Sequence, residues 1–175
     1  MRISQTAIAA SALILMAVGF SFPDSNGEIA EEGATTELYA EARPILDSYG
    51  GTDVRLNIVE PKLYCGDEDI VVACATLSGG QIYLNTNLPE SDAPLKSVVA
   101  HEYIHTLTSY EEAEWLRANV AVPGVSPLEV VADCGVSYFV APDSDDYAMH
   151  YMGNIGCTPE LTAVAGKVIY DQRLD

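Results

Sequence analysis

Two histidines and a glutamate lie close together in the segment His101-Glu102-Tyr103-Ile104-His105. Residues four apart share one face of an α-helix, so His101 and His105 would point in the same direction. Two neutral imidazoles in this arrangement can bind one zinc ion, and Glu102 can act as general base toward a water molecule that the zinc activates. The alternative is a helix that carries these residues by chance, because a short motif is only a hypothesis.

The residues around this motif favour a metal site. Apart from the histidines, Glu102 is the only charged residue from Val98 to Leu107. Apolar side chains cover nearly the whole circumference of such a helix, which indicates that it is buried. Buried histidines and a buried glutamate need partners. A zinc ion would provide them, and so would ordinary hydrogen bonds.

A catalytic zinc site needs a third protein ligand and leaves one position for water. The candidate is Glu129, near the start of the next predicted helix, with Asp133 four residues later on the same face. In this interpretation Glu129 binds zinc, and Asp133 accepts the second N–H of His101 or His105. Two alternatives stay open. Asp133 could itself be the ligand, or Glu129 could form a capping box with Ser126 and never reach the metal.

With these residues the sequence resembles the gluzincin metallopeptidases, the thermolysin-like clan of zinc enzymes. The resemblance covers the 101–105 segment with its uncharged flanks and the 129–133 segment, which has the family's Glu-x-x-x-Asp pattern. It implies that His101, His105 and Glu129 bind zinc, that Glu102 is the base, and that Asp133 orients a histidine. The match is confined to about residues 80–140. The chain lacks the length for the large helical second domain of the bigger members, so we expect a minimal single-domain form.

In the larger members that second domain contributes the residue that stabilises the oxyanion, so another residue must do so here. The candidates are His150, Tyr147 and Tyr151, which lie close together in a loop-like segment. A tyrosine O–H or a histidine N–H can donate to a developing oxyanion. For each of them, packing or a place in a surface loop is the alternative.

Periodic patterns indicate the elements that must position these groups. Helices are expected over residues 36–49, about 94–108, 110–119, 126–140 and 158–172, and strands over 54–59, 70–75 and 81–85. This order predicts an α+β, zincin-like fold, in which a small, mostly antiparallel sheet packs on the histidine helix and the following glutamate helix. A substrate chain can add to an exposed sheet edge, and our candidate edge is the 81–85 strand. An ordinary hairpin strand is the alternative.

The ends of the chain indicate an exported protein of one domain. Residues 1–22 combine Arg2 with an apolar run from Ala7 to Phe20, which is typical of a secretory signal peptide. An uncleaved N-terminal membrane anchor is the alternative. Residues 23–36 are acidic and poor in apolar side chains, which predicts a flexible linker. The metallopeptidase domain would then span residues 37–175, a length that suits a single domain.

Charge and cysteine content fit an extracytoplasmic location. The formal net charge of −18 excludes a general nucleic-acid binder, which needs a basic surface. The charge could steer basic substrates toward the protein, but we favour a role in solubility. The four cysteines predict two disulfides, and proximity along the chain favours Cys65–Cys74 and Cys134–Cys157 among the three pairings.

Together these observations predict a secreted zinc metallopeptidase that acts on a peptide or protein substrate. Membrane attachment is expected only if the N-terminal segment is retained. Two other functions stay open: a non-catalytic extracellular binding domain with a structural or degenerate metal site, and a zinc amidase that acts on cell-wall amides.

Overall fold

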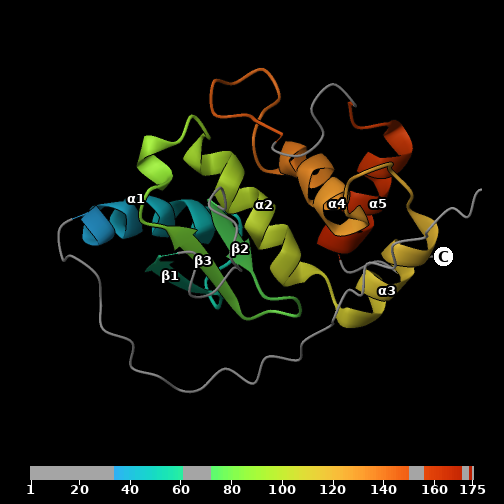
Figure 1. The fold of residues 1–175 in the computed structure, drawn as a ribbon, viewed down its shortest axis with the longest axis horizontal. Helices are drawn as coiled ribbons and strands as arrows, with labels where there is room; N and C mark the ends of the chain where they lie inside the picture. The colour runs from blue at the N-terminus through green and yellow to red at the C-terminus, as the bar shows by residue number, and fades with distance from the viewer. Residues whose placement is uncertain (1–33, 61–71, 150–155, 171–173, 175) are drawn as a thin grey trace, which may run out of the picture.

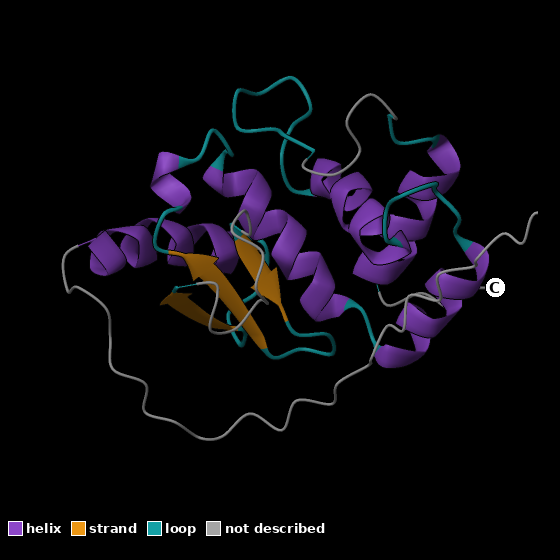
Figure 2. Cartoon of the chain, viewed as in Figure 1, coloured by secondary structure: helices purple, strands orange, loops and turns teal. Residues whose placement is uncertain are grey.

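The computed structural model describes residues 34–60, 72–149, 156–170 and 174. Within these ranges one helix precedes three short strands and the other helices follow them, an α+β arrangement as the sequence predicts (Figure 2). The elements are α1 (Ala34–Ser48), β1 (Arg55–Val59), β2 (Ala73–Ala75), β3 (Gln81–Asn85), the 3-10 helix η2 (Leu88–Glu90), α2 (Leu95–Leu107), α3 (Tyr110–Asn119), α4 (Pro127–Gly135), the 3-10 helix η3 (Val136–Tyr138) and α5 (Pro159–Ile169).

The sheet is mixed, with strand order β1-β3-β2. β1 pairs with β3 in parallel, and β2 pairs with β3 antiparallel. The expectation of a mostly antiparallel sheet therefore holds only for the β2–β3 pair. The prediction that residues 81–85 form an edge strand is wrong, because β3 is paired on both sides. Its last four residues are all buried, so both faces of this strand are covered.

One hydrophobic core lies between α1, the sheet and one side of α2. Leu46 of α1, Ile82 of β3 and Val99 of α2 are fully buried there. The Arg43 side chain fixes α1 to the turn before β1, since it donates to the carbonyls of Val54 at 2.8 Å and Gly51 at 2.6 Å. α1 begins at Ala34, so the helix includes the last residues of the predicted linker.

A second hydrophobic core lies on the other side of α2, against α3, α4 and α5 (Figure 1). It includes Ile104 of α2, Leu116 of α3, Val130 of α4 and Val168 of α5. α2 is thus packed between the sheet and a group of helices, and every residue from 97 to 106 is buried. This arrangement confirms the expectation of a buried motif helix.

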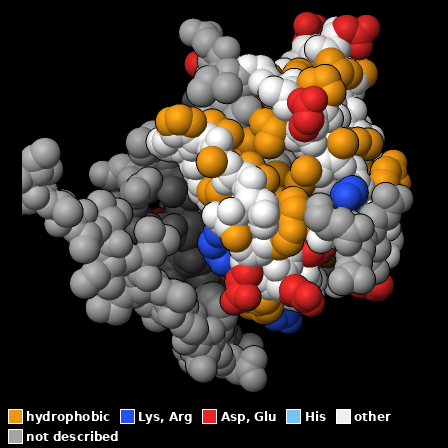
Figure 3. All heavy atoms as spheres, turned by 90° about the vertical axis from the view of Figure 1, so that its right-hand side faces the viewer, with side chains coloured by type: hydrophobic (Ala, Val, Ile, Leu, Met, Phe, Trp, Pro, Cys, Tyr) orange, Lys and Arg blue, Asp and Glu red, His pale blue; other side chains and the backbone are white. Residues whose placement is uncertain are grey.

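The remaining boundaries differ from expectation only in detail. α4 ends at Gly135 and continues as the tighter η3, whereas the sequence pattern predicted one helix to Val140. Figure 3 shows the end of the molecule formed by α3 and α5, where apolar side chains cover much of the face and acidic ones lie mainly above and below them. No helix among the described residues combines the length and apolar character needed to span a membrane. The predicted signal segment lies outside the described residues.

Candidate metal centre

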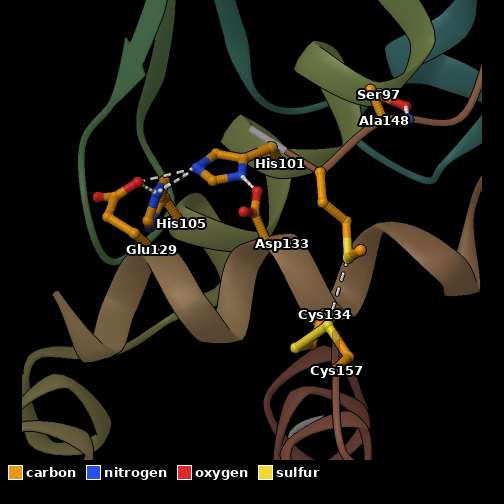
Figure 4. Close-up of polar contacts among 9 residues, drawn as sticks. Ser97, His101, His105, Glu129, Asp133, Cys134, Ala148 and Cys157 are labelled. Atoms are coloured by element: carbon orange, nitrogen blue, oxygen red, sulfur yellow. Dashed lines mark hydrogen bonds and ion pairs between the residues drawn. A yellow bond between two sulfur atoms is a disulfide. The ribbon is translucent and has the colours of Figure 1, made fainter. Parts of the chain in front are cut away.

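The site lies where α2 and α4 pack side by side. His101 and His105 lie one turn apart on α2, and Glu129 and Asp133 lie one turn apart on α4 (Figure 4). Gly135 permits this close packing, because a Cβ atom at its position would lie 2.5 Å from the Ile104 side chain. The four polar side chains therefore meet between two helices whose other contacts are apolar.

Three ligand-type atoms converge at this place. His101 Nε2 lies 3.0 Å from Glu129 Oε2 and 3.1 Å from His105 Nε2. His105 Nε2 lies 3.4 Å from the same Glu129 oxygen. Two imidazole nitrogens and one carboxylate oxygen thus form a compact triangle, and this group could hold a metal ion.

Asp133 binds the His101 ring on the side that faces away from the triangle. Its Oδ1 atom lies 2.8 Å from His101 Nδ1, and its side chain is fully buried. A carboxylate only accepts hydrogen bonds, so the Nδ1–H of His101 is the donor. This contact turns Nε2 of His101 toward Glu129 and His105, as the carboxylate partner of a metal-bound histidine does.

The charges at this centre change the proton affinities of its members. Burial alone would lower the pKa of His101, but its hydrogen bonds to Asp133 and Glu129 outweigh burial and raise the pKa to about 10. Burial would likewise raise the pKa of Glu129, but hydrogen bonds to His101 and His105 hold it well below its usual range. Without a metal ion, a proton on His101 Nε2 thus balances the Glu129 carboxylate.

Glu102 directly follows His101 on α2 and is itself buried, and its carboxyl interacts electrostatically with all three members of the triangle. Burial raises the pKa of its carboxyl, and the histidines His101 and His105 partly oppose that effect. Its Oε2 atom is fully enclosed and has no hydrogen-bond partner among the described residues. A buried carboxyl oxygen without a partner costs free energy, so such atoms are rare and call for an explanation.

The geometry separates the alternatives for the third member of the triangle. The Ser126 side chain makes no capping hydrogen bond at the start of α4, so Glu129 does not form the capping box considered for it. Asp133 contacts the Nδ1 atom of His101 rather than the Nε2 atom that faces the triangle. A complete capping box occurs instead at the start of α3, between Ser109 and Glu112.

Of the three candidates for oxyanion stabilisation, the structure describes only Tyr147. Tyr147 is half-buried and packs against the cluster formed by Ala100, Val136 and Val140. Burial and the negative charge of Asp133 raise the pKa of its hydroxyl. His150 and Tyr151 lie outside the described residues, and their predicted roles stay predictions.

A disulfide supports the helix that carries Glu129 and Asp133. Cys134 and Cys157 are bonded, with Cα atoms 5.5 Å apart, which confirms that predicted pairing. The bond links α4 to the residues just before α5. Cys74 is also disulfide-bonded, but its predicted partner Cys65 lies outside the described residues. Disulfides are typical of oxidising, extracytoplasmic compartments.

Sequence analysis missed one residue next to this site. Ser97 is fully buried on α2, four residues before His101, and it bonds to the segment around Tyr147. The repeated spacing of four from Ser97 to His101 to His105 was the available signal.

Comparisons with known proteins give no relative for this chain. No protein-family model matches it, and neither the curated proteins nor the solved structures include a significant match. Its function is therefore argued from the geometry of the site.

Proposed function

We propose that the protein is an exported zinc-dependent peptidase whose centre is the His101, His105 and Glu129 triangle. The observation that carries this proposal is the buried Glu102 carboxyl beside the triangle, with one oxygen that has no partner among the described residues. A purely structural metal site would not need a second glutamate there. A general base does need a free oxygen close to the metal and the reacting water.

Zinc fits this set of donors better than other common ions. Two imidazoles and one carboxylate are a familiar ligand set of catalytic zinc, and they leave a fourth position for water. Zinc lies about 2.0–2.1 Å from such ligands, which in a tetrahedron separates the ligand atoms by about 3.3–3.4 Å. The separations of 3.0, 3.1 and 3.4 Å between the three ligand atoms come close to this value. Magnesium and calcium prefer oxygen ligands.

When bound, zinc would polarise the scissile carbonyl and lower the pKa of the attacking water. Glu102 then accepts the proton of that water and passes it to the leaving amine. Asp133 keeps His101 in the tautomer that presents Nε2 to the metal. Tyr147 and His150 are our candidates for a hydrogen bond to the developing oxyanion.

A peptide is the substrate that the sheet suits best. β2 is an outer strand of the sheet, and no described strand pairs with its free edge. β2 also contacts α2, so its edge lies next to the helix that carries the two histidines (Figure 1). An extended peptide could add to this edge through backbone hydrogen bonds, and the candidate substrate edge therefore moves from β3 to β2.

The test is peptide hydrolysis by the zinc-loaded protein, with Glu102→Gln as the decisive variant. We expect Glu102→Gln to retain zinc and to lose about 10²–10⁴-fold in rate, which is the usual contribution of a general base. Glu111→Gln, which changes an exposed glutamate of α3, is the matched control and should keep full activity. Equal rates for the wild type and Glu102→Gln would contradict the proposal. Cleavage of cell-wall amides but not of peptides would favour an amidase.

A further inference from the structure

The segment after η3 is fastened to the motif helix next to the first histidine. We call residues 141–149 the strap. Ser97 Oγ donates to the Asp146 carbonyl at 2.5 Å and accepts from the Ala148 N–H at 2.8 Å. Lys96 and Asp146 form an exposed ion pair at 2.6 Å beside these bonds. One hydroxyl group thus holds the strap on both sides of Tyr147.

The position of Ser97 links the strap to the metal centre. Ser97 precedes His101 by four residues, so both side chains lie on the same face of α2. Figure 4 shows Ser97 and Ala148 one turn along this helix from His101. Ser97 is fully buried, so water cannot replace its hydrogen bonds without a local opening.

The far end of the strap lies against the disulfide. Met149 Sδ is 3.6 Å from Cys157 Sγ, and the bonded partner Cys134 directly follows Asp133. Residues 146–149 of the strap are therefore bonded to Ser97 of α2 and lie against the bridge on α4. Tyr147 lies between the two residues that Ser97 binds, and it packs against the cluster that includes Ala100 of α2.

We propose that Ser97 is a positioning residue for the metal centre: it fixes the strap so that Tyr147 covers the hydrogen bond between His101 and Asp133 and keeps water from it. Tyr147 packs against the cluster of Ala100, Val136 and Val140. Ala100 directly precedes His101, and Val136 lies three residues after Asp133. The effect of the Asp133 charge on the pKa of the tyrosine agrees with this placement. The inference rests on the metal centre of the proposed function, but not on peptidase activity.

Covering this hydrogen bond matters because a hydrogen bond shielded from water is stronger than an exposed one. The bond from His101 to Asp133 orients a metal ligand, and loss of such an outer partner costs about 10–100-fold in metal affinity. Exposing the bond to water should cost less than removing Asp133, so we expect an effect near the lower limit, about tenfold.

The experiment measures zinc affinity by competition with a chelator in Ser97→Ala, Tyr147→Ala and the double variant. We expect each single variant to bind zinc about tenfold more weakly, and the double variant to bind no more weakly than Tyr147→Ala. Ser91→Ala is the matched control. Ser91 also donates to a carbonyl and accepts from a backbone N–H, but these partners are Leu88 and Ala93, which precede α2, so zinc affinity should stay unchanged.

A second measurement tests the strap without a metal. Hydrogen exchange at the Ala148 amide should become faster in Ser97→Ala and stay as in the wild type in Ser91→Ala. Unchanged exchange at Ala148 would overturn the proposed anchoring. If Ser97→Ala fails to fold, Tyr147→Ala decides: a loss of zinc affinity supports the proposal, and wild-type affinity overturns it.

The other outcomes separate this inference from the proposed function. Zinc affinity in folded Ser97→Ala within twofold of the wild type overturns the inference alone, as do additive losses in the double variant. Tight zinc binding without hydrolysis of any peptide refutes the proposed function but leaves the inference standing if the variants behave as expected. A wild-type protein that binds no zinc overturns both.

Discussion

Removing the metal should leave His101 protonated far into the alkaline range. In the metal-free protein its Nδ1–H faces Asp133 and its Nε2–H faces Glu129, and these hydrogen bonds outweigh the cost of burial. The pKa of His101 rises to about 10, against an ordinary value of 6.5. At pH 8 an ordinary imidazole is only about 3% protonated, whereas the His101 imidazole is nearly fully protonated.

This proton should make the stability of the metal-free protein depend on pH. A group whose folded pKa is raised contributes stability that is complete below its unfolded pKa and is lost as the pH rises through its folded pKa. For His101 this range runs from pH 6.5 to about pH 10. Between about pH 7.5 and 9 the folded state binds close to one more proton than the unfolded state at this residue. Its contribution to the free energy of unfolding therefore falls by about 1.4 kcal/mol per pH unit.

The assay combines chelator-treated protein, histidine NMR and urea unfolding at several pH values. Asp133→Asn removes a carboxylate that raises the His101 pKa, so its His101 should titrate at lower pH and its pH slope should be shallower. Asp53→Asn changes an exposed carboxylate in the turn before β1, and it should behave like the wild type. A His101 ring that titrates near 6.5 in the metal-free wild type would refute this account of the charges.

Three further predictions concern stability and packing. Glu102→Gln should raise the melting temperature of the metal-free protein above pH 5, because burial disfavours the ionised carboxylate; an unchanged or lower melting temperature would contradict this. Replacing both Cys134 and Cys157 by serine should lower the free energy of unfolding by about 2–4 kcal/mol in urea titrations, and full retention of stability would show that the bridge is dispensable. Gly135→Ala should cost about 1–3 kcal/mol and weaken zinc binding, because a Cβ atom there meets the facing helix, whereas Gly156→Ala has open space and should be neutral.

The parts of the site that could be predicted from the sequence depend on local spacing. His101 and His105 are four apart, as are Glu129 and Asp133, and helical geometry alone places each pair on one face. The uncharged flanks of the motif indicated a buried helix, and α2 is buried from residue 97 to 106.

The remaining features depend on tertiary packing. The residue pattern of one strand does not show which strands pair with it, so β3 could not be recognised from the sequence as the centre of the sheet. Glu129 could equally have capped its own helix, and the close packing of α4 on α2 at Gly135 brings it to the histidines instead. Ser97 continues the spacing of four that His101 and His105 share. Its bonding partners lie about fifty residues further along the chain, so the spacing alone could not show what Ser97 binds.

The most direct test of the central claim is the zinc content of the folded protein after exchange into metal-free buffer, measured by elemental analysis. The account predicts one tightly bound zinc ion per chain in the wild type and in Glu111→Gln, and a large loss in the nearly isosteric Glu129→Gln. A wild-type protein without zinc, or a Glu129→Gln protein that retains all of it, would contradict the assignment of this triangle as a metal centre.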